Sequence, residues 1–166
     1  MSDIRFRRAR PADAPAIRDL YRAAAEGGTL ARMPDEVDDA YVAGFMHAAQ
    51  NGLELVAEAS GKVVGDLHAT RLFPRQFVRT LGDLTIAVHP AHQGQGIGKQ
   101  LFVEFMRIVR EEMPDIERVE LFAWDENKSA LKLYESVGFK FEGLLPHRVR
   151  TDSGEWRNDI LYGWVR

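Results

Sequence analysis

A strand, a glycine-rich turn and an amphipathic helix follow one another in residues 84–113, and this succession constrains the fold more than any other segment. Residues 84–88 are Leu-Thr-Ile-Ala-Val, a run typical of a strand. The helix predicted over 97–113 carries apolar side chains on a wide face, and another strand is predicted over 118–123. Because a helix connects the two strands, we expect them to be parallel neighbours in one sheet.

The segments on either side of this unit predict a mixed sheet. Alternating and continuous apolar runs favour strands over 4–8, 53–59, 62–72, 77–88, 139–144 and 158–165. Helical periodicity predicts helices over 11–25, 34–50 and 128–137, the last with Asn127 as its N-cap and Gly138 just past its end. The fold class is therefore α/β, or α+β on stricter labels, with residues 1–166 as a single domain.

Composition narrows the classes of protein to be considered. The chain has 166 residues, enough for one full core, with 45% hydrophobic and 28% charged residues. It has no apolar run as long as a membrane span and no signal-peptide core at its N-terminus, so we expect a cytoplasmic protein that does not bind membranes. The net charge of −3 disfavours nucleic acid as the main partner. The absence of cysteine excludes disulfides, thiolate metal sites and a cysteine nucleophile.

The glycine turn at 92–99 matches neither of the common phosphate-binding motifs. A P-loop needs Gly at position 93 and Ser or Thr at position 100, and both positions are Gln. A dinucleotide fingerprint that begins at Gly94 needs a third glycine where Lys99 stands. Two interpretations remain open from spacing alone. The turn either aims backbone N–H groups at an anion such as a diphosphate, or only lets a strand and a helix pack closely.

Two segments resemble the signatures of a known family. Residues 84–98, with Gln93, Gly96 and Gly98, resemble the acyl-CoA-binding motif of the GNAT superfamily of N-acetyltransferases, which is Gln or Arg, two residues, Gly, one residue, then Gly or Ala. Residues 127–139 resemble the second signature of that family, and the order of predicted elements also matches. The resemblance implies a GNAT-like mixed sheet of about six to seven strands flanked by about four helices.

The resemblance also implies acetyl-CoA as cosubstrate, with no metal. Backbone N–H groups between Gln93 and Lys99 would hold the diphosphate, and the pantetheine arm would lie along the edge of the strand that ends at Val88. An N–H near Val88 would stabilise the oxyanion of the tetrahedral intermediate. The cofactor-binding residues expected on this basis are Ile86, Ala87, Val88, Gln93, Gly94, Gln95, Gly96, Ile97, Gly98, Lys99, Asn127, Ala130 and Tyr134.

Acetyl transfer to an amine needs a group that accepts the amine's proton and a group that protonates the departing thiolate. Tyr134 matches the position of the family's acid, although helical spacing alone favours a core aromatic. Asp83 is the candidate base, acting through water. Its alternatives are a paired structural group or a carboxylate at a solvated edge. Strand alternation places Asp83, Thr85 and Ala87 on one face. Without cysteine, direct transfer in a ternary complex is favoured.

The closing segment resembles the branch of the family that includes amino-acid, polyamine and ribosomal-protein acetyltransferases. We expect a small primary amine as acceptor, such as an L-amino acid or a derivative. A polyamine or a protein N-terminus is the alternative among enzymes, and a non-catalytic CoA-binding regulatory domain is the alternative of another class. Arg71, Arg75 and Arg79 are candidates for holding a substrate carboxylate, although solvated surface charge is the favoured interpretation of each one taken singly. A homodimer, common in the family, is a further expectation.

Two polar clusters have simple structural explanations. His89 and His92 lie three residues apart in a loop with no further ligand nearby in sequence, so we expect no metal site there. An acidic group at residues 35–39 begins a predicted helix and complements the helix dipole. Its alternative role is to attract a cationic amine toward an acceptor site.

Overall fold

The computed structural model describes residues 4–166, and one seven-stranded sheet extends through them in the order β1-β2-β3-β4-β5-β7-β6. The strands β4 and β5 are parallel, and all other neighbouring pairs are antiparallel. The predicted mixed sheet and its parallel pair are therefore confirmed. The strands are β1 (Ile4–Arg8), β2 (Leu53–Ala59), β3 (Lys62–Arg71), β4 (Thr80–Val88), β5 (Arg118–Trp124), β6 (Lys140–Arg150) and β7 (Trp156–Val165).

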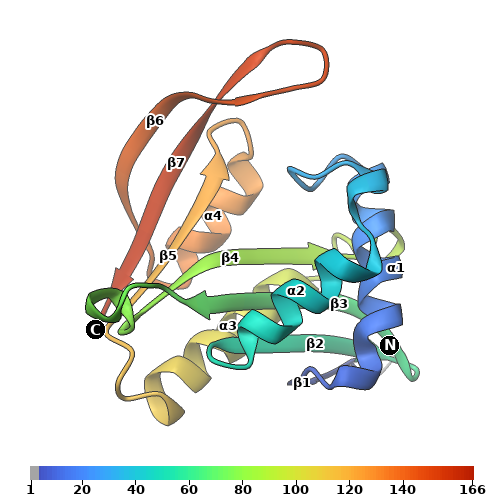
Figure 1. Ribbon diagram of the computed structural model, residues 1–166, viewed down its shortest axis with the longest axis horizontal. Coiled ribbons are helices and arrows are strands. Elements are labelled where there is room, and N and C mark those ends of the chain that lie inside the picture. Colours follow the sequence, from blue (N-terminus) through green and yellow to red (C-terminus); the bar gives the residue numbers. More distant parts are fainter. Residues whose placement is uncertain (1–3) are drawn as a thin grey trace.

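Four α-helices pack on the two faces of this sheet (Figure 1). One core contains the buried side of α3 (Ile97–Glu112) and of α4 (Lys128–Ser136), and the other contains α1 (Ala14–Glu26) and α2 (Asp39–Ala49). The apolar positions predicted for the inner face of α3 are all buried, which confirms that prediction. They share one side of the helix because side chains three and four residues apart lie on the same face. These positions are Ile97, Leu101, Phe102, Phe105, Ile108 and Val109. Among the helices described, none has the length and apolar character of a membrane span.

Several predicted boundaries differ from the structure for local reasons. The starts of the first two predicted helices are short 3-10 turns, Pro11–Asp13 and Pro34–Glu36, each begun by a proline that fits a first helical position. The fourth predicted strand, 77–88, begins at Thr80 in the structure, because Arg75–Phe77 forms another 3-10 turn. The closing strands are longer than predicted. Most side chains of β6 are exposed, so no apolar alternation marks its length.

Candidate active site

A cleft opens where β4 and β5 part. The two strands pair only at Thr80 with Arg118 and at Leu81 with Val119, and beyond these pairs they diverge (Figure 1). A cavity of about 1000 Å³ lies there, bounded by the second half of β4, the end of β5, the glycine turn, α4 and the α1–α2 connection. We call it the β4–β5 cleft. It leaves one edge of β4 without a partner strand, so alternate backbone groups along that edge are available to a ligand.

A backbone irregularity lies where the divergence begins. Asp83 has a left-handed backbone with φ of 50°, and the pairing of β3 with β4 shifts register between His68 and Thr70. Asp83 is exposed and lines the cleft, and its carboxylate accepts a hydrogen bond from Thr70 Oγ1 at 3.3 Å. The alternation predicted beyond it is confirmed, because Leu84 faces the α3 core and Ala87 faces the α1–α2 core.

The glycine turn is shaped for an anion and not for close packing. Gly94 and Gly96 have left-handed φ values of 75° and 78°, and an added Cβ at either would meet no atom within 4 Å. A Cβ on Gly98 would make ordinary contacts, 3.6 Å from Ile86 Cδ1 and 3.7 Å from Val88 Cγ2. Close approach of α3 to β4 therefore does not require these glycines. The backbone conformation requires two of them, and the space beside them is open.

The N-terminus of α3 points this open turn toward the cleft. Its N-cap residue is Gly96, which offers no side chain to cap the helix. The first-turn N–H groups, those of Ile97, Gly98 and Lys99, have no acceptor within the helix, and all three residues line the cleft. Together with the positive end of the helix dipole, these donors form a site for a phosphate or diphosphate.

Gln93 fixes the turn to the end of β4. Its Nε2 donates to the carbonyl of Val88 at 3.1 Å, so this carbonyl is already engaged. Ile86 and Val88 line the cleft as expected. Two other residues of the expected set do not. The Ala87 side chain is buried against α1 and α2 because it faces the opposite side of the sheet, and Gln95 is exposed, with its Nε2 3.5 Å from the carbonyl of Ala91.

Tyr134 lines the cleft from α4 and also packs in the core. Its ring lies against that of Phe102, with ring centroids 5.2 Å apart, and only 6% of the residue is exposed. Burial raises the pKa of Tyr134 to about 12. Within residues 4–166 its hydroxyl has no hydrogen-bond partner, in contrast to nearby Tyr162, whose hydroxyl donates to Glu135 at 2.8 Å. A neutral phenol with a free O–H therefore borders the cavity.

The N-terminus of α4 forms another wall of the cleft. The predicted N-cap is confirmed, because Asn127 Oδ1 accepts hydrogen bonds from the N–H of Ala130 at 3.2 Å and from Ser129 Oγ at 3.1 Å. Asn127 and Ala130 both line the cavity. The N-terminus of α4 and the N-terminus of α3 thus border the same cleft.

The structure favours the simpler interpretation of the three arginines, as surface charges rather than part of the acceptor site. None of Arg71, Arg75 and Arg79 lines the cleft. Arg71 pairs with Asp115 at 2.6 Å and Arg79 pairs with Glu117, at the end of β4 where it is still paired with β5. The cleft instead contains a carboxyl group to which the sequence assigned no role, that of Asp159 on β7. The alternation of side chains along β7 was the only sequence pattern that could have pointed to Asp159. This pattern assigns residues to two faces of the strand but does not tell which face borders a cleft.

The other polar clusters have structural roles. At the start of α2, Asp38 caps the helix by accepting from the N–H of Tyr41 at 2.7 Å, and Asp39 pairs with Arg18 at 2.8 Å. His89 Nδ1 accepts from the N–H of Ala91 at 3.2 Å. Over residues 4–166, no group of three or more His, Cys, Asp or Glu side chains is arranged to hold a metal ion.

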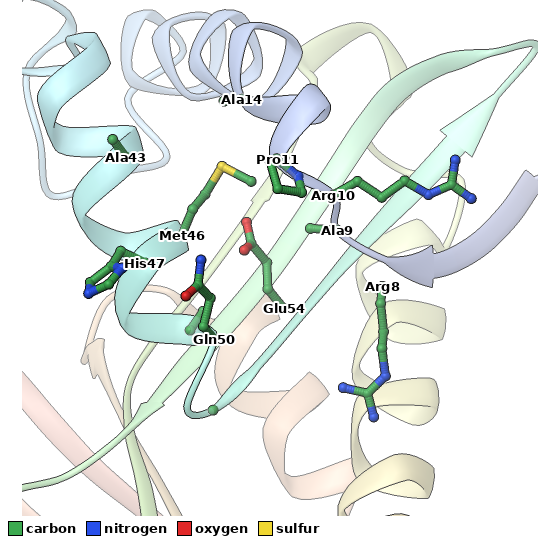
Figure 2. A pocket seen from close by; sticks show the side chains of 12 residues that line it. Arg8, Ala9, Arg10, Pro11, Ala14, Ala43, Met46, His47, Gln50 and Glu54 are labelled. Atoms are coloured by element: carbon green, nitrogen blue, oxygen red, sulfur yellow. The ribbon is translucent and has the colours of Figure 1, made fainter.

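A second cavity of about 370 Å³ lies between the C-terminal part of α2, residues 8–14 and the start of β2. Figure 2 shows the Glu54 side chain extending into it near Met46 and Pro11. Burial and the neighbouring Asp66 raise the pKa of Glu54 to about 8. Asp66 is fully buried and accepts from the hydroxyl of Tyr21 at 2.7 Å.

One oxygen of Glu54 and one of Asp66 lack a hydrogen-bond partner within residues 4–166. A proton on Glu54, donated to Asp66, satisfies both. None of the expected cofactor-binding residues borders this cavity, so the β4–β5 cleft remains the candidate active site.

Comparison with known proteins agrees with the geometry of the cleft. The model of the acetyltransferase (GNAT) family matches residues 14–139. The chain belongs to this family. As a GNAT member it is an acetyl-CoA-dependent N-acetyltransferase, and its α/β fold with a mixed sheet is the fold of its structural neighbours.

Similar GNAT proteins differ in their named substrates. L-amino acid N-acyltransferase MnaT of Escherichia coli (strain K12) is 33% identical over 160 residues, which cover 92% of this chain and 87% of that protein. Mycothiol acetyltransferase of Paenarthrobacter aurescens (strain TC1) is 30% identical over 114 residues, and the match spans only 30% of that protein's length.

Two solved GNAT structures superpose on nearly the whole chain. A ribosomal-protein-alanine N-acetyltransferase from Brucella melitensis has a TM-score of 0.85 and 26% identity, with 98% of this chain and 99% of that chain covered. The YncA protein of Salmonella typhimurium, solved with its cofactor acetyl-CoA, has a TM-score of 0.84 and 25% identity, with 98% and 93% covered.

Proposed function

We propose that this single-domain protein transfers the acetyl group of acetyl-CoA directly to a small primary amine, such as an L-amino acid or a derivative. The observation that carries the proposal is the uncapped N-terminus of α3, which presents free N–H groups and open space beside Gly94 and Gly96 to the β4–β5 cleft. The similarity to the L-amino acid N-acyltransferase MnaT over most of both chains supports this choice of acceptor.

The residues around the turn fit the cosubstrate. The N–H groups from Gly94 to Lys99 would bind the diphosphate, and the Lys99 side chain adds a positive charge at the same rim. The free edge of β4 at Ile86 and Val88 would bind the pantetheine arm as an added strand. Bound there, acetyl-CoA supplies a thioester whose carbonyl an amine attacks. A β4 N–H would stabilise the oxyanion that forms on that carbonyl.

Tyr134 would protonate the departing thiolate. Its raised pKa keeps the hydroxyl protonated at neutral pH, so the group is an acid and not a base. Its O–H is unused by the protein within residues 4–166 and borders the cavity. The Tyr134 ring packs against Phe102 and Tyr162, with ring centroids 5.2 Å and 6.2 Å away. This packing holds the hydroxyl in place, which a weak acid requires if it is to protonate the thiolate.

Asp83 would accept the amine's proton through water. Its carboxylate stands at the start of the divergent part of β4 and lines the cleft, with Thr70 holding one oxygen. Because the Asp83 carboxylate is exposed to solvent, a water molecule between it and the amine would carry the proton. Together, Asp83 and Tyr134 would give the cleft one acceptor and one donor of protons.

The test is release of free CoA, followed with a thiol reagent, on a panel of amino acids, polyamines and N-terminal peptides. We expect turnover with at least one small amine. Turnover only with polyamines or peptides would favour the alternative acceptors. Tight acetyl-CoA binding without turnover on any amine would indicate a CoA-binding regulatory domain and contradict the proposal.

A further inference from the structure

Asp159 is a largely enclosed carboxyl group whose hydrogen-bonding capacity is unused. It lies on β7, directly opposite Trp124 of β5, and it lines the β4–β5 cleft. Only 8% of the residue is exposed, and within residues 4–166 no group donates a hydrogen bond to its side chain. The nearest cation is Arg148, whose Nε is 3.7 Å from Asp159 Oδ2, too far for a hydrogen bond.

Enclosing a carboxyl group without hydrogen-bond donors costs free energy, unless a ligand supplies the missing donors. An ionised carboxylate removed from water needs donors, and these are absent on the protein side. Burial raises the pKa of Asp159, with Asp125 adding to the rise and Arg148 opposing it. The Asp159 side chain is 11% exposed, and the residue lines the cleft. The unfilled positions of this carboxyl group are therefore accessible from the cavity where the acceptor must enter.

The surroundings of Asp159 combine two aromatic rings with two arginines. Trp124 and Phe122 line the cleft next to it, and the Arg157 guanidinium lies over the Trp124 ring, 4.9 Å from its centroid. The Arg148 guanidinium lies over the Phe122 ring, 3.9 Å from its centroid, and so stands beside the carboxyl group of Asp159. A ligand bound to Asp159 therefore has a cation beside that anion, although Arg148 itself is not among the residues that line the cavity.

We propose that Asp159 binds the ammonium group of the acceptor while Arg148 binds a carboxylate one carbon away, so that the acceptor is an α-amino acid zwitterion. This inference rests on the proposed function and assigns residues to its acceptor half. An α-amino acid carries its ammonium group and its carboxylate on the same carbon, which matches the neighbouring charges of Asp159 and Arg148. A polyamine would bring a second cation toward Arg148, which repels it.

Asp159 and Asp83 have different roles in this arrangement. Asp83 is exposed at the start of the divergent strand, whereas Asp159 is enclosed and faces an aromatic wall. Asp159 therefore recognises the acceptor, and its loss should act on KM. Asp83 serves the proton transfer, and its loss should act on kcat.

The test compares the best acceptor among the twenty L-amino acids with its carboxamide, at saturating acetyl-CoA. For Asp159→Asn we expect KM for both acceptors to rise about tenfold or more, with kcat little changed, because a charged hydrogen bond to the ammonium is lost. For Arg148→Gln we expect a higher KM for the amino acid and an unchanged KM for its carboxamide. Asp152→Asn and Arg150→Gln, on the same hairpin and without an ion pair to Asp159 within residues 4–166, are matched controls.

The outcomes separate this inference from the proposed function. Turnover with polyamines but with no amino acid would overturn the zwitterion assignment and leave the acetyltransferase activity intact. An Asp159→Asn variant with wild-type KM, or Arg148→Gln with equal effects on the amino acid and its carboxamide, would also overturn it. Acetyl-CoA affinity and the thermal midpoint, measured on the same samples, separate a lost contact from a misfolded variant.

Discussion

Replacing Glu54 with Gln should change how the stability of the protein depends on pH. Burial and Asp66 raise the pKa of Glu54 from 4.5 to about 8 in the folded state. Between these two values the folded protein holds a proton that the unfolded chain has released, so the free energy of unfolding falls as pH rises from about 4.5 to about 8 and then levels off. Glutamine cannot ionise, and its amide can donate to Asp66 as the protonated acid does.

The size of the effect follows from the same shift. At ~1.4 kcal/mol per pH unit, a rise from 4.5 to about 8 corresponds to at most about 5 kcal/mol. Glu54 borders a cavity and is only partly buried, so solvent screens its charge and reduces this figure. We expect about 2 kcal/mol. The other titratable groups beside it, Asp66, His68, Tyr21 and Asp13, are present in both proteins.

The assay is urea unfolding at pH 4, 7 and 9 of the wild type, of Glu54→Gln and of the exposed control Glu26→Gln. We expect Glu54→Gln to match the wild type at pH 4, below the unfolded pKa, and to be about 2 kcal/mol more stable at pH 9. Glu26→Gln should follow the wild type throughout. Parallel curves for the wild type and Glu54→Gln would refute the argument, because they would mean that Glu54 ionises as readily in the folded state as in the unfolded chain.

Three further substitutions test the cleft. Gly96→Glu should weaken acetyl-CoA binding in calorimetry by more than about tenfold, because a carboxylate would repel the diphosphate; Gly61→Glu carries similar backbone strain in a turn that does not line the cleft and should bind normally. Tyr134→Phe should lower kcat about a hundredfold with unchanged acetyl-CoA affinity. Tyr162→Phe is its control, and equal turnover in the two variants would remove Tyr134 from the mechanism. Asp83→Asn should lower kcat roughly tenfold or more without changing acetyl-CoA affinity; a wild-type kcat would exclude it as the base.

The sequence predicted those parts of the fold that depend on interactions between residues close together in the chain. The inner face of α3 follows from the helical period of its apolar residues, and the Asn127 cap follows from a side chain that satisfies a free N–H. The parallel pairing of β4 with β5 follows from the helix between them. The exposed strand β6 carries no such pattern, and its length depends on pairing with β7 across two shifts of register.

The site depends on features that the sequence does not record locally. The cleft exists because β4 and β5 separate after two pairs, next to a left-handed backbone at Asp83 and a register shift in the pairing of β3 with β4. For this reason the sequence could not tell that Arg71 and Arg79 lie at the closed end, nor that Asp159 borders the open one. The glycine turn was predictable because left-handed backbone positions demand glycine.

The most direct test of the central claim is a crystal structure of the protein with saturating acetyl-CoA. The account predicts a diphosphate within hydrogen-bond distance of the N–H groups between Gly94 and Lys99, with the thioester between β4 and β5 and near the Tyr134 hydroxyl. Acetyl-CoA bound at any other surface, or a cleft left empty at saturation, would contradict it.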